Sequence, residues 1–213
     1  SMASGEIYYV VRGAGSTQWD GEALDWRAGD IFCLPGGVAR SHRASAAGDC
    51  VLYVATDEPA LAFARVVPAA PEAAPIAPVH YPAPLLAAEV DALCRRELGP
   101  DTAGRALFLT SDRMLRQRTC LPSLTLTLNV VLPGERQRPH RHNAAAIVFV
   151  TKESSVRSRI GDRSFPWTQN AVLITPPNAV HSHENEGSES AIALIVQDGG
   201  LHYHCPTMGF AFA

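Results

Sequence analysis

The chain has 213 residues, of which 46% are hydrophobic, so it is long enough to bury one large core or two smaller ones. Its formal net charge is −3 and no long basic run is present, which argues against nucleic acid as the main partner. No stretch approaches the roughly 18 apolar residues of a membrane span, so no membrane association is expected. The five cysteines lack a Cys-x-x-Cys spacing, which predicts reduced, mostly buried thiols in a cytoplasmic protein.

Short apolar and β-branched runs recur along the chain and are separated by Gly, Pro and Asn. They predict strands at 7–11, 31–34, 51–55, 124–131, 147–151, 157–160, 171–174 and 191–196. The Ala/Pro-rich segment 66–84 is expected to be extended, and 85–98 has the pattern of an amphipathic helix that ends before Gly99. Many short strands with turn residues between them are typical of an all-β barrel or jelly roll.

The chain contains an internal repeat, because residues 6–57 shifted by 141 positions fall on 147–198 without a gap. Trp26 then coincides with Trp167, and the turn at 20–21 coincides with the turn at 161–162. Arg40 takes the place of His181, and Ser1 aligns with His142. The first copy is therefore expected to be partial and unable to build the metal site described next.

Three histidines of the second copy are candidate metal ligands. His140 and His142 are two positions apart in an extended stretch, so their side chains share one face of a strand. His181 lies in another strand, 39 residues after His142. Three neutral imidazoles can bind a divalent transition metal and leave coordination positions open, as catalytic sites do. A second His-x-His, at His202 and His204, lacks a third ligand at such a spacing and is expected on a half-exposed strand.

These residues resemble the two-part signature of the cupin superfamily. The first part, Gly-x5-His-x-His, corresponds to residues 134–142, and the second part, ending Pro-x4-His-x3-Asn, corresponds to residues 176–185. Asn170 and Asn178 replace the two glycines of the second part, and the glutamate expected after His142 is absent. A three-histidine site without this glutamate is most similar to the gentisate 1,2-dioxygenase group, which includes salicylate and 1-hydroxy-2-naphthoate dioxygenases.

The resemblance implies an all-β cupin jelly-roll barrel, and together with the repeat it implies a bicupin. The expected parts are a partial, metal-free cupin at 1–65, a linker and one helix at 66–104, and a metal-binding cupin barrel at 105–213. A partial barrel leaves open sheet edges, which oligomers commonly cover. We therefore expect a homodimer or a larger homo-oligomer in which residues 6–57 contribute to the interface.

The implied activity is that of a non-haem Fe(II) dioxygenase, which uses O2 to cleave the ring of a hydroxylated aromatic substrate. Zinc, nickel or manganese are also compatible with three imidazoles. His183 resembles the histidine that lies beside the substrate in this group. It is a candidate general base or hydrogen-bond partner, the alternative being a histidine that only supports the fold.

Three further residues bear on the substrate. Arg138 is a candidate anion contact, and Trp167 is a candidate substrate contact for which a core role is the better explanation, because Trp26 is its counterpart in the other copy. Val148 stands where the resembled group carries an arginine that grips the substrate carboxylate, which argues against gentisate or salicylate and favours a less anionic substrate. Two alternatives to a dioxygenase stay open. One is a metal-binding bicupin without redox activity that binds a small molecule, and the other is a metal-dependent isomerase, lyase or hydrolase.

Overall fold

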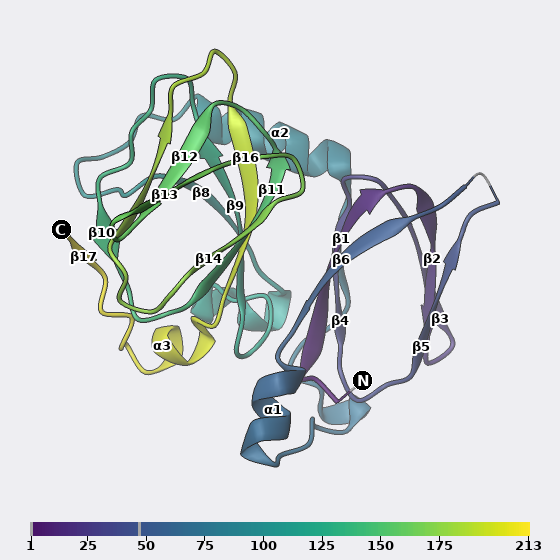
Figure 1. Cartoon of the computed structure of the whole chain (residues 1–213). Coiled ribbons are helices and arrows are strands. Elements are labelled where there is room, and N and C mark those ends of the chain that lie inside the picture. Colours follow the sequence, from purple (N-terminus) through teal and green to yellow (C-terminus); the bar gives the residue numbers. More distant parts are fainter. Residues whose placement is uncertain (1, 47) are drawn as a thin grey trace. The chain divides into compact units, whose positions relative to one another are not determined.

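The computed structural model describes residues 2–46 and 48–213, in which strands predominate, as the sequence predicts (Figure 1). The chain forms two compact units. The first comprises Ser1–Ala88, Thr110–Arg116 and Cys120–Pro122, and the second comprises Glu89–Leu109, Gln117–Thr119 and Ser123–Ala213. Among the described residues, no helix has the length and apolar character needed to cross a membrane.

The first unit contains a four-stranded and a three-stranded sheet. The first sheet has the order β6-β1-β4-β7, formed by Val51–Thr56, Gly5–Arg12, Ile31–Pro35 and Val79–Tyr81. The second has the order β3-β2-β5, formed by Glu22–Arg27, Ala14–Trp19 and Arg40–Ala44. Three helical segments follow in the chain: α1 (Glu58–Ala64), the 3-10 turn η1 (Pro71–Ala73) and α2 (Ala83–Cys94). The segment 66–84, expected to lack regular structure, thus contributes β7 to a sheet.

The second unit is built from two five-stranded sheets, seen as the green and yellow barrel in Figure 1. One has the order β13-β12-β15-β10-β17, formed by Arg163–Pro166, Val156–Ile160, His181–Asn185, His140–Arg141 and Ala211–Phe212. The other has the order β14-β11-β16-β9-β8, formed by Val172–Thr175, Ala146–Lys152, Ala191–Gln197, Thr125–Val131 and Arg105–Leu109. Helix α3 (Gly200–His204) also belongs to the second unit, whereas the 3-10 helix η2 (Asp112–Gln117) lies mainly in the first.

Each unit buries the side chains that alternate along its strands. In the first unit, Tyr8, Val10, Trp26, Phe32 and Leu34 form one apolar cluster. In the second unit, the corresponding cluster draws on both sheets and contains Val131, Ala146, Val148, Val150, Val156, Trp167, Ala191, Ala193 and Ile195. The core of the second unit therefore lies between its two sheets, and the metal-binding candidates lie at one end of this interior.

All eight strands expected from the sequence are present, but two local expectations are wrong. Helix α2 ends at Cys94 rather than at residue 98. The side chain of Arg105 donates to the carbonyl oxygens of Leu93 at 3.1 Å and Arg96 at 2.5 Å, and so satisfies this end of the helix. His202 and His204 lie on α3 and not on a strand.

Among the cysteines, Cys33 and Cys120 are buried, whereas Cys205 is exposed.

Strand pairing supports the internal repeat but corrects its register by one residue. The pairs of β2 with β3 and β5 recur in β12 with β13 and β15 at an offset of 141. However, Glu6 pairs with Thr56 and Ala146 pairs with Gln197, so β1 corresponds to β11 at an offset of 140 (146 − 6). Both strands carry their irregularity at the same place, after Val10 and after Val150. The counterpart of Val148 is therefore Tyr8.

Candidate metal centre

The three candidate ligands converge at one end of the second unit. His140 on β10 pairs directly with His181 on β15, and His142 follows two positions after His140. One nitrogen of each ring lies within 4.8 Å of the others, and all three residues are at least nine-tenths buried. Over residues 2–46 and 48–213, these histidines form the one group of three or more side chains arranged to hold a metal ion.

Backbone contacts determine which ring nitrogen of each histidine is free. The Nδ1 atoms of His140, His142 and His181 lie 3.0, 2.9 and 2.9 Å from carbonyl oxygens, those of Arg138, Ala144 and Ala179 respectively. A carbonyl only accepts, so each Nδ1 carries the hydrogen and each Nε2 keeps its lone pair. Such contacts are the usual means of orienting a metal-binding histidine. The donor set therefore fits a divalent transition metal.

Burial keeps the three rings neutral. Desolvation is the main cause that lowers the pKa of His140 and His142 below the usual value of 6.5, and it lowers the pKa of His181 to about 4. Neighbouring imidazoles act in the same direction, whereas the backbone hydrogen bonds oppose it. Near neutral pH, each ring can therefore offer its Nε2 lone pair without first losing a proton.

His183, two residues after His181, has the opposite tautomer. Its Nδ1 lies 2.8 Å from the Oγ of Ser158, which in turn accepts a 2.7 Å hydrogen bond from the Trp167 indole. The structure as described gives the Ser158 hydroxyl hydrogen no other acceptor, so this hydrogen is donated to Nδ1 of His183. His183 consequently carries its own hydrogen on Nε2, and burial lowers its pKa to about 3. It is a neutral hydrogen-bond donor.

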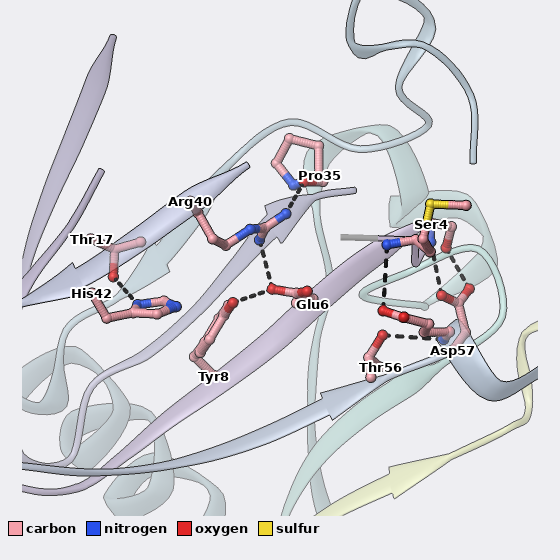
Figure 2. Close-up of polar contacts among 11 residues, drawn as sticks. Ser4, Glu6, Tyr8, Thr17, Pro35, Arg40, His42, Thr56 and Asp57 are labelled. Atoms are coloured by element: carbon pink, nitrogen blue, oxygen red, sulfur yellow. Dashed lines mark hydrogen bonds and ion pairs between the residues drawn. The ribbon is translucent and has the colours of Figure 1, made fainter. Parts of the chain in front are cut away.

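The first unit repeats this arrangement of tryptophan, hydroxyl and histidine. The Trp26 indole donates to Oγ1 of Thr17 at 2.8 Å. The same Oγ1 lies 2.8 Å from Nδ1 of His42 (Figure 2). These residues correspond to Trp167, Ser158 and His183 at the offset of 141. The arrangement thus occurs both in the unit that contains the three clustered histidines and in the unit that does not.

An ion pair occupies the place of the metal ligands in the first unit. Arg40, the counterpart of His181, lies 2.9 Å from the carboxylate of Glu6 and donates to the carbonyl of Pro35 at 2.7 Å (Figure 2). The Tyr8 hydroxyl donates to the same carboxylate. A guanidinium is a cation and cannot coordinate a metal ion in the way an imidazole does. Arg40 therefore offers no metal ligand where His181 offers one, and the metal-free character of the first copy stays a prediction.

A cavity of about 460 Å³ adjoins the three histidines in the second unit. Its apolar wall includes Phe108, Val148 and Phe210, and its polar wall includes Thr127, Asn129, Gln137 and Gln197. Arg118 and Asp101 are the charged residues of the lining. This volume is suited to a small organic molecule.

The expected site residues separate into two groups. Val148 and His183 line the cavity together with the three candidate ligands. Trp167 does not line it, because its ring is buried in the core and acts on the site only through Ser158. Arg138 does not line it either, since its guanidinium stacks over the Phe212 ring with 3.8 Å to the centroid.

Sequence reasoning missed several residues of the cavity wall. Phe210 immediately precedes β17, which pairs with β10 at His140. Its ring centroid lies 5.3 Å from that of His140. Gln137 and Arg118 lie in irregular segments outside the strands that were expected. In the sequence, Gln137 is distinguished only by its closeness to the first histidine motif. No sequence pattern distinguishes Phe210 or Arg118.

Residues 128–197 match the family model described as a cupin domain. Over 107 residues the chain is 34% identical to 1-hydroxy-2-naphthoate 1,2-dioxygenase from Nocardioides sp. strain KP7, a segment that covers 49% of this chain and 28% of that protein. Over 72 residues it is 35% identical to gentisate 1,2-dioxygenase from Haloferax sp., covering 33% and 20%. The matched segments therefore span less than a third of these relatives.

Two solved structures share the fold. Salicylate 1,2-dioxygenase from Pseudaminobacter salicylatoxidans superposes with a TM-score of 0.82 at 12% identity, covering 98% of this chain and 69% of that one. A cupin 2 conserved barrel domain protein from Leptotrichia buccalis gives a TM-score of 0.57 at 16% identity, covering 92% and 74%. Together with the family match, these structures confirm the expected cupin fold. The relatives in sequence confirm the resemblance to the gentisate 1,2-dioxygenase group.

Proposed function

We propose that the cupin domain at residues 128–197 binds a transition metal through His140, His142 and His181, and that it acts as a dioxygenase on a hydroxylated aromatic compound. The observation that carries the proposal is a set of three neutral imidazoles, each with a free Nε2 lone pair, beside a cavity large enough for an aromatic ring. Iron(II) is the metal we favour, because the relatives in sequence are named as dioxygenases. Zinc, nickel and manganese also accept imidazole ligands.

The metal would bring substrate and O2 into one coordination sphere, which supplies proximity and a route for electrons. The protein's part is to hold and orient the substrate. We assign His183 the role of donating its Nε2 hydrogen to an oxygen of the substrate. With a pKa of about 3 the ring is neutral near neutral pH and takes up no second proton, so it acts as a hydrogen-bond donor rather than as a base.

The cavity wall supports an aromatic substrate. Phe108 and Phe210 provide aromatic surface, and the ring of Phe210 lies beside that of His140. Flat aromatic side chains bind an aromatic ring through offset or edge contacts.

A second candidate function rests on Val148. This residue is 2% exposed and lines the cavity at the position where the resembled dioxygenases carry an arginine. Without that cation, the cavity suits a metal-binding protein that holds a small molecule without redox turnover, or a metal-dependent isomerase or lyase. Oxygen consumption distinguishes these functions from a dioxygenase.

The test begins with metal analysis of the purified protein and continues with oxygen uptake in the presence of catechols, gentisate and aminophenols. His140→Ala, His142→Ala and His181→Ala should each lower the metal content sharply and abolish substrate-dependent uptake. His204→Ala, on the exposed helix α3, is the matched control and should retain the metal. Full metal content in all three variants would refute the ligand assignment. A metal-loaded protein that consumes no oxygen with any substrate would favour the second candidate function.

A further inference from the structure

The side chain of Gln137 is a buried amide with no hydrogen-bond partner among residues 2–46 and 48–213. Gln137 is 4% exposed and lines the cavity beside the three histidines. Its backbone N–H donates to the carbonyl of His183 at 2.9 Å, but its side-chain amide makes no hydrogen bond to the residues that the structure describes. The amide is not sealed in the core either, so it opens onto the cavity. A buried polar group without a partner is unfavourable unless an occupant of the cavity satisfies it.

Gly104 makes room for this amide. A Cβ atom at position 104 would lie 2.3 Å from Nε2 and 2.8 Å from Cδ of Gln137. Any larger residue would therefore displace the amide, whereas glycine allows the backbone to lie directly against it. The contact limits how the side chain can turn, so the amide is held ready for an occupant.

The remaining deep polar groups of the cavity are also uncharged. Asn129 accepts a hydrogen bond from Thr127 at its Oδ1 atom, at 2.7 Å, which leaves its Nδ2 group free to donate. Val148 contributes only methyl groups. Arg118 is the single cation of the lining, and its exposed side chain is hydrated and screened by solvent. Recognition inside the cavity is thus left to neutral hydrogen-bonding groups.

We propose that Gln137 determines specificity, and that it selects an aromatic substrate whose second substituent is uncharged and both donates and accepts hydrogen bonds, such as a carboxamide. The Gln137 amide donates through Nε2 and accepts through Oε1, which complements a carboxamide at both atoms. A carboxylate would place an acceptor against Oε1, and no buried cationic side chain of the lining would pair with its charge. The inference rests on the proposed function, which supplies the aromatic ring and its attachment at the metal.

Two probes of nearly the same shape test the inference. They are 2-hydroxybenzamide and 2-hydroxybenzoate, which share the ring and hydroxyl group and differ in amide against carboxylate. Their binding to the metal-loaded protein is measured by calorimetry without O2, so the readout does not depend on turnover. The amide should bind about tenfold more tightly than the carboxylate, as one or two added hydrogen bonds imply.

Gln137→Met keeps the length of the side chain and removes the amide. It should weaken binding of 2-hydroxybenzamide about tenfold and leave 2-hydroxybenzoate almost unchanged. Gly104→Ala displaces the amide without deleting it and should act in the same direction, so it replaces the first variant if that one does not fold. Gln18→Ala, on an exposed strand position of the first unit, is the control and should change neither affinity. Metal content and melting temperature check that each variant is folded.

Two results would overturn the inference. One is that Gln137→Met leaves the affinity for 2-hydroxybenzamide unchanged. The other is that the native protein prefers 2-hydroxybenzoate and loses this preference in Arg118→Ala, which would assign recognition to that arginine. Absence of oxygen uptake with retained, Gln137-dependent selectivity for the amide would refute the dioxygenase activity and leave the role of Gln137 intact.

Discussion

His183 and Ser158 share a hydrogen bond of 2.8 Å between Nδ1 and Oγ, and a bond of the same length joins the corresponding His42 and Thr17 in the first unit. In both units the hydroxyl also accepts a hydrogen bond from a tryptophan indole. The first unit has Arg40 in place of a metal ligand, so this arrangement does not depend on a metal. It is part of the fold, and the second unit additionally uses it to fix the tautomer of a histidine beside the cavity.

Ser158→Ala should lower the free energy of unfolding by about 1–3 kcal/mol, because it leaves the Trp167 indole and Nδ1 of His183 buried without partners. Ser158→Thr copies the residue found at position 17, retains the hydroxyl and should cost less. Urea denaturation of the metal-free proteins measures both effects. Equal stability of the alanine and threonine variants would show that the hydrogen bonds contribute little.

The metal-free protein should lose stability as the pH falls below 6.5. The pKa values of His181 and His183 are lowered to about 4 and about 3 in the folded chain, whereas the unfolded chain titrates near 6.5. Below pH 6.5 the unfolded state binds more protons, so each histidine contributes a loss of about 1.4 kcal/mol per pH unit until its folded pKa is reached.

Urea denaturation at pH 7.5, 6.5, 5.5 and 4.5, with a chelator present, measures this dependence. His183→Asn should reduce the slope below pH 6.5 by about one proton, whereas His204→Asn should leave it unchanged. A stability that is flat from pH 6.5 to pH 4.5 would contradict the burial of these two rings.

Val148→Arg should create a carboxylate site. Position 148 is 2% exposed and lines the cavity, so a guanidinium there would strengthen binding of salicylate about ten- to a hundredfold. The melting temperature should fall, because Val148 leaves an apolar cluster and a long cation is buried instead. Val172→Arg, at an exposed position of β14, is the control that should change neither property. Tight salicylate binding by the native protein, with no gain in the variant, would contradict this.

The homodimer expected from the sequence stays a prediction, with residues 6–57 at its interface. Strand β6 lies at the edge of its sheet and exposes Val51 and Val54. Val54→Lys should therefore weaken the dimer, whereas Val172→Lys, on an edge strand of the second unit, should not. Light scattering at micromolar concentration measures both, and a monodisperse native monomer would exclude the dimer.

The sequence predicts the strands and the three clustered histidines well, because both depend on short, regular patterns. Short runs of apolar and β-branched residues define β11 and β16, and the spacing of the first histidine motif places His140 and His142 together. The same reasoning fails where the strand is not regular. Strand β10 is only two residues long, so parity with His140 does not bring Arg138 into the cavity, and Gln137 lines it instead. The pairing of β17 with β10 is a long-range contact that no local pattern specifies.

Tyr8 and Val148 occupy equivalent strand positions in the two units, because β1 corresponds to β11 at an offset of 140. Val148 lines the cavity of the second unit, whereas Tyr8 stacks on Phe32 with 4.6 Å between ring centroids. Together with Arg40 and Glu6, Tyr8 occupies in the first unit the region that corresponds to the cavity of the second unit. The strand pairing, the turn and the tryptophan are thus common to the two units, whereas their interiors differ. A few inward side chains therefore distinguish two interiors built on the same pattern of strands.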